Sequence, residues 1–139
     1  MAEKQSEASN PFPLRIILAD DNPLDRMIAR RVLKALGYSG DEVCNGVELL
    51  HAVRTQKYDV VLTDVQMPEM GGLEATRQIH GYYPPEERPF IIGVTSENTG
   101  SDRQLGLAAG MNVYLTKPLQ REELAIALSQ VMQPQTLNA

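Results

Sequence analysis

The sequence predicts one α/β domain in which five mainly parallel strands alternate with five helices that cover both faces of the sheet. Short apolar segments alternate along the chain with stretches that carry apolar residues at helical spacing. Three of the apolar segments are continuous, as strands buried on both faces require. The length of 139 residues suits one domain with a substantial core.

The first strand and the first helix illustrate how each element is assigned. The segment "LRIILAD" from residue 14 is short, apolar and β-branched, which predicts a buried strand. Asn22 can cap the helix that follows, Pro23 suits its first turn and Gly37 can end it. The same criteria predict further strands at about 42–44, 58–64, 88–96 and 113–116, and further helices over about 47–56, 72–80, 101–110 and from 121 onward.

Composition narrows the function classes. The net charge of −5 argues against a nucleic-acid-binding face, and no apolar run approaches the roughly 20 residues of a membrane span. The polar N-terminus lacks a secretory signal and Cys44 cannot form an internal disulfide, so we expect a cytoplasmic protein with Cys44 as a small buried residue. Residues 1–13 are predicted to be a disordered leader, 14–132 the domain and 133–139 a tail or linker.

Polar residues stand at the ends of four predicted strands. Asp20 and Asp21 end the first strand, Asp64 the third, Thr95 the fourth and Lys117 the fifth. The carboxyl ends of parallel strands meet at one edge of the sheet, where such folds bind ligands. Three carboxylates there would raise each other's pKa values, and Mg²⁺, which prefers oxygen ligands, would relieve this repulsion. The lysine and threonine side chains can both donate to phosphate oxygens.

A carboxylate at this edge can also act as a nucleophile. Asp64 could form an aspartyl phosphate while the metal and Lys117 offset the charge of the transferring group. The turns at 67–68 and 71–72 would bring the main-chain carbonyl of Gln66 near the metal as a further ligand. Taken singly, each residue has an ordinary explanation such as helix capping or surface charge, and it is their combination that favours a site.

Four segments together resemble the receiver domains of two-component signalling proteins. They are "LADDN" at 18–22, "LTDVQMPEMGGLEA" at 62–75, "GVTS" at 93–96 and "AAGMNVYLTKPL" at 108–119. They occur in order, each at a predicted strand end, and the resemblance covers about 14–132. It implies a flavodoxin-like sheet with the strand order 2-1-3-4-5.

The resemblance implies a role for each matching residue. Asp64 resembles the phosphoacceptor, which takes phosphate from a phosphohistidine on a histidine kinase or a histidine phosphotransfer protein. Asp21 and Asp64 would bind Mg²⁺ directly together with the Gln66 carbonyl, and Asp20 would act through water. Lys117 resembles the lysine that pairs with the phosphate.

The resemblance also implies a conformational switch. Thr95 resembles the hydroxyl residue that moves onto the phosphoryl group, and Tyr114 resembles the aromatic residue that rotates inward with it. The surface formed by residues 101–110, 113–116 and the last helix would then change and be read by partners, with homodimerisation as an open alternative. The peptide bond before Pro118 is typically cis in this family.

The chain departs from the family pattern at several positions. Gly71–Gly72 stands where Asp-Gly is common, and Gln66 and Glu97 occupy variable positions that tune phosphate hydrolysis. The long segment "HGYYPPEERP" at 80–89 resembles receivers fused to hybrid sensor histidine kinases. We therefore expect either a single-domain regulator or the receiver module of such a kinase, tethered in the second case to a membrane sensor.

Two other functions stay open. A pseudo-receiver would bind partners without being phosphorylated, but the intact set of acids, threonine and lysine argues against it. A phosphohydrolase of the haloacid dehalogenase type would need a second acid two residues after its nucleophile, and Gln66 at that position cannot transfer a proton. As a receiver, the domain would not be a turnover enzyme beyond its own phosphorylation and dephosphorylation.

Overall fold

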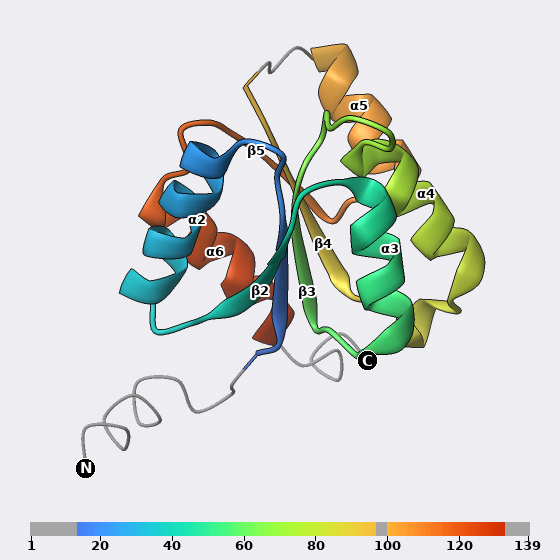
Figure 1. Cartoon of the computed structure of the whole chain (residues 1–139), viewed down its shortest axis with the longest axis horizontal. Coiled ribbons are helices and arrows are strands. Elements are labelled where there is room, and N and C mark those ends of the chain that lie inside the picture. Colours follow the sequence, from blue (N-terminus) through green and yellow to red (C-terminus); the bar gives the residue numbers. More distant parts are fainter. Residues whose placement is uncertain (1–13, 97–99, 133–139) are drawn as a thin grey trace.

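A parallel sheet forms the centre of the computed structural model, which describes residues 14–96 and 100–132 (Figure 1). Its strands lie in the order β2-β1-β3-β4-β5, which confirms the predicted order. The strands are β1 (Ile16–Ala19), β2 (Gly40–Val43), β3 (Val60–Asp64), β4 (Phe90–Thr95) and β5 (Val113–Thr116). The helices are α2 (Pro23–Ala35), α3 (Gly46–Thr55), α4 (Gly72–Tyr82), α5 (Gly100–Ala109) and α6 (Arg121–Met132), with a short 3₁₀ helix η1 (Pro85–Glu87).

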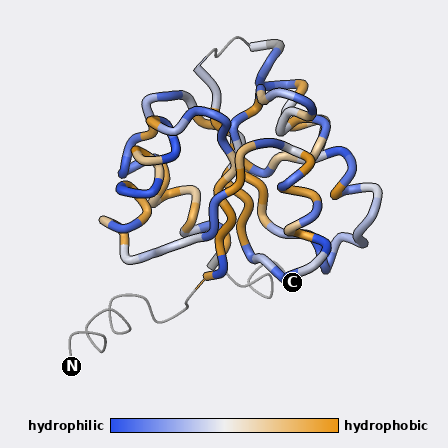
Figure 2. Tube along the Cα trace, in the orientation of Figure 1, coloured by the Kyte–Doolittle hydropathy of each residue, from blue (hydrophilic) through white to orange (hydrophobic). Residues whose placement is uncertain are grey.

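Helices cover both faces of the sheet. Figure 1 shows α2 and α6 on one face and α3, α4 and α5 on the other. The side chains of β1 alternate between the two resulting cores, with Ile16 and Leu18 on the α2–α6 side and Ile17 and Ala19 on the other. Figure 2 shows the apolar residues along the strands and the polar residues on the outer sides of the helices. The strands therefore form a rigid platform for the groups at their ends.

Helix α2 begins directly after the first strand end, as predicted. The side-chain oxygen of Asn22 accepts hydrogen bonds from the backbone N–H groups of Leu24 (2.9 Å) and Asp25 (3.2 Å), and Pro23 occupies the first turn. Gly37 follows the helix with a φ of 92°, the left-handed conformation that glycine adopts without strain. The cap fixes the backbone between the acids of β1 and the first turn of the helix.

Several expectations are corrected at the level of single elements. The second strand covers 40–43 and not 42–44, and the third helix extends to Tyr82. The expectation that Cys44 is buried is wrong, because it follows the edge strand β2 and is exposed. The predicted leader and tail at 1–13 and 133–139, and Glu97, lie outside the described residues. In the part of the chain that the structure describes, no helix is long and apolar enough to cross a membrane.

The connection between α4 and β4 lies at the end of the sheet opposite the strand carboxyl ends. It contains η1, whose residues are all exposed. The guanidinium of Arg88 donates to the backbone carbonyl of His80 (3.0 Å) and to that of Tyr83 (2.9 Å). These bonds satisfy carbonyls at the end of α4 and fasten the connection to the helix.

Candidate functional site

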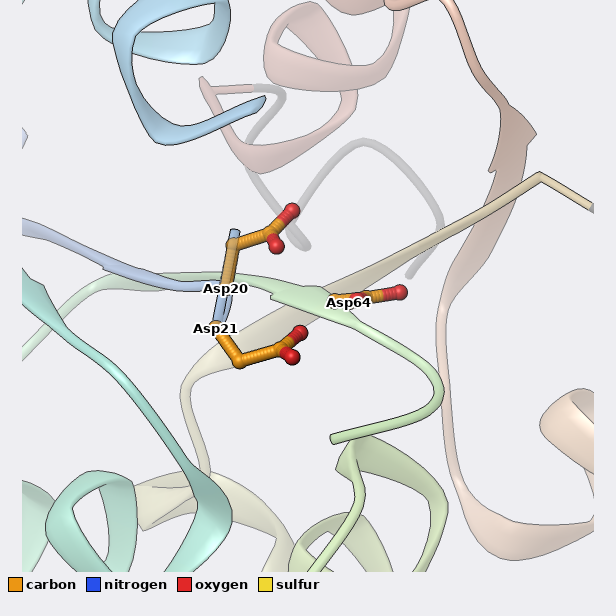
Figure 3. Close-up of side chains that lie close together, drawn as sticks. All are labelled: Asp20, Asp21 and Asp64. Atoms are coloured by element: carbon orange, nitrogen blue, oxygen red, sulfur yellow. The ribbon is translucent and has the colours of Figure 1, made fainter. Parts of the chain in front are cut away.

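Three carboxylates meet at the carboxyl ends of β1 and β3. Asp20 and Asp21 follow β1 directly, and Asp64 is the last residue of β3. Because β1 and β3 pair in parallel with Ala19 opposite Thr63, the acids reach the same edge of the sheet. One oxygen from each carboxylate lies within 4.8 Å of the others, and Figure 3 shows the three side chains pointing into one space. The sequence-predicted acidic cluster is therefore assembled.

Backbone groups hold two of these acids in place. The N–H of Asn22 donates to Asp20 Oδ1 at 2.9 Å, and the N–H of Gln66 approaches Asp64 Oδ1 at 3.4 Å. The guanidinium of Arg26 donates to the Asp20 carbonyl at 2.8 Å. The carboxylates of Asp20 and Asp64 are thus oriented by the loops that follow their strands.

Lys117 reaches the acids from the end of β5. Its ammonium nitrogen lies 3.0 Å from Asp20 Oδ2 and 3.5 Å from Asp64 Oδ2. It also lies 2.9 Å from Asp25 Oδ2, on the first turn of α2. The peptide bond between Lys117 and Pro118 is cis, as the resemblance implied. Sequence reasoning missed Asp25, although its place one turn into the helix that starts at the acidic edge is a signal that could have drawn attention to it.

The site holds more carboxylates than positive charges, and the pKa values of Asp64 and Lys117 are both shifted. The pKa of the Asp64 carboxyl is raised to about 6, first by burial and second by the charge of Asp20, while Lys117 and the Gln66 N–H oppose the rise. For Lys117, burial acts to lower the pKa, but hydrogen bonds to Asp25 and Asp20 outweigh it and the pKa lies above its usual value. A divalent cation beside the acids would relieve the cost of ionising Asp64.

A cleft of about 330 Å³ opens beside the acids. Its polar wall is formed by the carboxylates and Lys117, and its apolar wall by side chains of α2 and the strands. The lining includes Asp20, Asp25, Asp64, Lys117, Ile28, Ala29 and Val94. Ser96, just after β4, also lines this space. The cleft has room for a small anionic group next to the carboxylate oxygens of Asp20 and Asp64.

Thr95 and Tyr114 lie on the neighbouring strands. Thr95 is buried at the end of β4, and its carbonyl accepts a hydrogen bond of 2.8 Å from the backbone N–H of Lys117. This bond ties the end of β4 to the residue that carries the ammonium. Tyr114 on β5 is 3% exposed and packs in the core beneath α5, where its ring borders Gly106. The structure thus places both residues near the Lys117 end of the sheet.

The Gly71–Gly72 pair has a packing explanation. A Cβ on Gly72 would lie 2.2 Å from the Asp64 carbonyl oxygen and 2.8 Å from Thr63 Oγ1, both far inside contact distance. The N–H of Gly72 donates to the Val65 carbonyl at 2.9 Å. The start of α4 therefore packs directly against the strand end that carries the acid, which only glycine permits here.

The fold and this edge together define a class of protein: a doubly wound domain with an acidic, lysine-containing cleft at its strand ends. The chain belongs to the response regulator receiver domain family, which it matches over residues 16–129. Receiver domains are modules of two-component signalling, so the family suggested by the sequence motifs is confirmed.

Known proteins similar to the chain include sensor kinases and their receivers. The chain is 39% identical over 132 residues to Sensor protein EvgS of Escherichia coli K12, covering 95% of this chain but only 11% of that protein. The receiver domain of sensor histidine kinase PA1611 of Pseudomonas aeruginosa PAO1, solved with a magnesium ion coordinated in its active site cleft, matches with a TM-score of 0.77 and 34% identity over 87% of this chain and 99% of that one.

A third similar structure contains a partner. It is the co-crystal structure of the Saccharomyces cerevisiae histidine phosphotransfer signaling protein Ypd1 with the receiver domain of its downstream response regulator Ssk1. The match has a TM-score of 0.73 and 24% identity, and covers 81% of this chain and 84% of that chain. At this identity the match describes the fold.

Proposed function

We propose that the chain is a phosphoryl-accepting signalling switch in which Asp64 takes phosphate from a phosphohistidine. The observation that carries the proposal is the meeting of Asp20, Asp21 and Asp64 within 4.8 Å, with the Lys117 ammonium 3.5 Å from Asp64 Oδ2. Asp64 stands on a rigid strand end beside a cleft large enough for a phosphoryl group.

The proposed phosphoryl transfer from phosphohistidine to Asp64 needs no further co-reactant to balance bonds and protons. An oxygen of Asp64 forms a bond to phosphorus as the phosphorus–nitrogen bond of the phosphohistidine breaks. The bonding pair stays on the imidazole nitrogen, and the ring, protonated at its other nitrogen, leaves as neutral imidazole. Lys117 would pair with one phosphoryl oxygen, and the Thr95 hydroxyl would donate to another.

The site residues fit Mg²⁺. Asp20, Asp21 and Asp64 supply hard carboxylate oxygens, and the Gln66 carbonyl is proposed as a further ligand. When bound, the cation supplies positive charge that offsets the negative charge of the phosphoryl oxygens. The raised pKa of Asp64 supports this assignment, because a carboxyl that is costly to ionise alone gains most from a cation.

The output would pass through protein contacts. Movement of Thr95 toward the phosphoryl group would be coupled to Tyr114, and partners would read the surface of α5, β5 and α6. Histidine kinases and histidine phosphotransfer proteins are the expected phosphate partners of a domain of this family. Because the receiver domain of sensor histidine kinase PA1611 is 34% identical to the chain, we favour the receiver module of a hybrid kinase over a single-domain regulator.

Intact-mass spectrometry after incubation with a small-molecule phosphodonor, with and without Mg²⁺, tests the proposal. We expect one Mg²⁺-dependent phosphoryl adduct on the wild type and none on Asp64→Asn, because an amide is not a nucleophile. Asp59→Asn is the matched control, since Asp59 precedes the opposite end of the same strand. It should be labelled like the wild type.

The other outcomes identify the alternatives. Absence of an adduct on a folded wild type would favour the pseudo-receiver. Continuous release of phosphate from a phosphomonoester would favour the phosphohydrolase. Labelling of Asp64→Asn at the wild-type rate would show that another residue accepts the phosphate.

A further inference from the structure

The nearest partner of Lys117 is not the acid that would carry the phosphate. The ammonium lies 2.9 Å from Asp25 and 3.0 Å from Asp20, both within charge-assisted hydrogen-bond range, but 3.5 Å from Asp64. In this arrangement the positive charge is turned toward α2. A phosphoryl group on Asp64 would therefore have to share the ammonium with Asp25 and Asp20 or draw it away from them.

Asp25 is held where it can keep this contact. The Asn22 cap fixes its backbone N–H, and the rest of α2 packs on the sheet through Ala29 and Leu33. The Asp25 side chain is 31% exposed and the Lys117 side chain 18%, so water screens the pair only partly. The contact joins residues 92 positions apart in the chain and is a tertiary feature of the site.

Helix-end electrostatics alone do not explain this contact. Acids in the first turn favour a helix by interacting with its dipole, and Glu48 of α3 and Glu74 of α4 occupy the same kind of position. Glu48 accepts from the Cys44 N–H and Glu74 pairs with Arg77, so both serve their own surroundings. Asp25 is the first-turn acid of the three whose carboxylate reaches Lys117.

The charge count at the cleft gives the direction of the effect. Three carboxylates, those of Asp20, Asp25 and Asp64, lie within 3.5 Å of the Lys117 ammonium, and Asp21 adds a fourth negative charge beside Asp20 and Asp64. Asp20, Asp21 and Asp64 form the cluster suited to a cation, which leaves Asp25 outside that cluster with its charge directed at Lys117. A phosphoryl group and the Asp25 carboxylate would thus compete for the same positive charge.

We propose that Asp25 is a positioning residue for Lys117 that competes with the phosphoryl group for the ammonium and so weakens phosphoryl binding at Asp64. The inference rests on the proposed function. It adds an acid on α2 that tunes how strongly the site holds phosphate, separate from the acids that bind the metal.

Titration with beryllium fluoride, a phosphoryl mimic, tests this at saturating Mg²⁺ by calorimetry on the wild type, Asp25→Asn and Asp25→Ala. We expect both variants to bind about five- to tenfold more tightly, the effect of removing one half-buried charge contact. Glu74→Gln, which removes a first-turn acid that does not contact Lys117, should bind like the wild type. Thermal melting of each variant reports any loss of helix stability separately.

The outcomes separate the two proposals. Wild-type binding with equal or weaker binding by both Asp25 variants would overturn the role of Asp25 and leave the phosphoryl site in place. Lower melting temperatures with unchanged affinity would show that Asp25 only stabilises α2, which also overturns it. Lack of beryllium fluoride binding by the wild type would overturn the proposed function and this inference together.

Discussion

Without a bound cation, the ionised form of the Asp64 carboxyl is unfavourable in the folded protein. Its side chain is 11% exposed, and its pKa is raised to about 6 by burial and then by the charge of Asp20. Ionisation at neutral pH therefore costs the folded protein free energy.

This cost predicts a pH-dependent effect of Asp64→Asn. Because the folded pKa lies above the ordinary value of 3.8, the folded protein binds more protons than the unfolded chain between about pH 4 and 6, and the free energy of unfolding falls as pH rises through this window. Without metal at pH 7.5, the variant should be more stable by on the order of 2 kcal/mol, and the difference should vanish near pH 4.

Urea unfolding in a chelating buffer, followed by circular dichroism at both pH values, measures this difference. Asp59→Asn serves again as the control, since Asp59 is exposed at the opposite end of β3 from Asp64, and an asparagine oxygen can still accept the hydrogen bond from the Arg15 N–H. Equal stability of Asp64→Asn and the wild type at pH 7.5 would mean that the buried carboxylate is compensated by its surroundings.

Single residues also mark the limit of what the sequence could predict at the site. Asp20, Asp21, Asp64 and Lys117 come together as expected, because each lies at the carboxyl end of a parallel strand or directly after it. Asp25 could not be assigned in the same way. A first-turn acid is common on any helix, and its contact with Lys117 depends on the angle at which α2 crosses the sheet.

At the scale of elements, α5 packs on β5 where the ring of Tyr114 lies against a glycine, Gly106. The Tyr114 ring lies where a Cβ on Gly106 would come within 2.8 Å of it, and Met111 Sδ would lie 3.1 Å away. A mid-helix glycine costs about 1 kcal/mol relative to alanine. Here the absence of a side chain leaves room for the buried tyrosine.

Gly106→Ala should therefore destabilise the protein by about 1 kcal/mol despite the better helix former, because the ring must move. Gly81→Ala is the matched control, since a Cβ on this α4 glycine meets nothing within 4 Å and should stabilise the helix. Chemical denaturation measures both effects. In a Tyr114→Ala background, Gly106→Ala should no longer destabilise; a persistent loss would place the strain elsewhere.

Element boundaries were predicted well where burial is uniform. The continuous apolar runs of β1, β3 and β4 were found because both faces of those strands are covered. The bounds of β2 were missed because this edge strand reads "GDEV" and is largely exposed. Its Glu42 pairs with Arg26 and Arg30 of α2, so the strand is held by charges that leave no apolar pattern in the sequence.

At the scale of the molecule, the site should couple metal binding to folding. A cation that binds the assembled carboxylates but not the unfolded chain stabilises the fold in proportion to the logarithm of its concentration over its dissociation constant. Asp64 lies more than 40 residues after Asp20 and Asp21 in the sequence, so the three acids come together only in the folded protein.

Thermal melting with increasing Mg²⁺ checks this coupling. We expect the wild-type melting temperature to rise by several degrees when Mg²⁺ reaches about 100 times its dissociation constant, equivalent to about 2.7 kcal/mol. Asp21→Ala should lose most of the rise, and Thr95→Ala should keep it. Equal responses from the two variants would contradict the assigned metal ligands.

The α4–β4 connection has a consequence for how the protein tolerates change. The guanidinium of Arg88 hydrogen-bonds the connection to the end of α4. The exposed turn at 85–87 lies at the opposite end of the sheet from Asp64. Insertions or attached labels at 85–87 would lengthen a surface loop without altering the strand ends, and loop closure costs little extra free energy with length. This turn is a natural attachment point for a reporter group, and its length could vary without disturbing the acidic cluster at the strand ends.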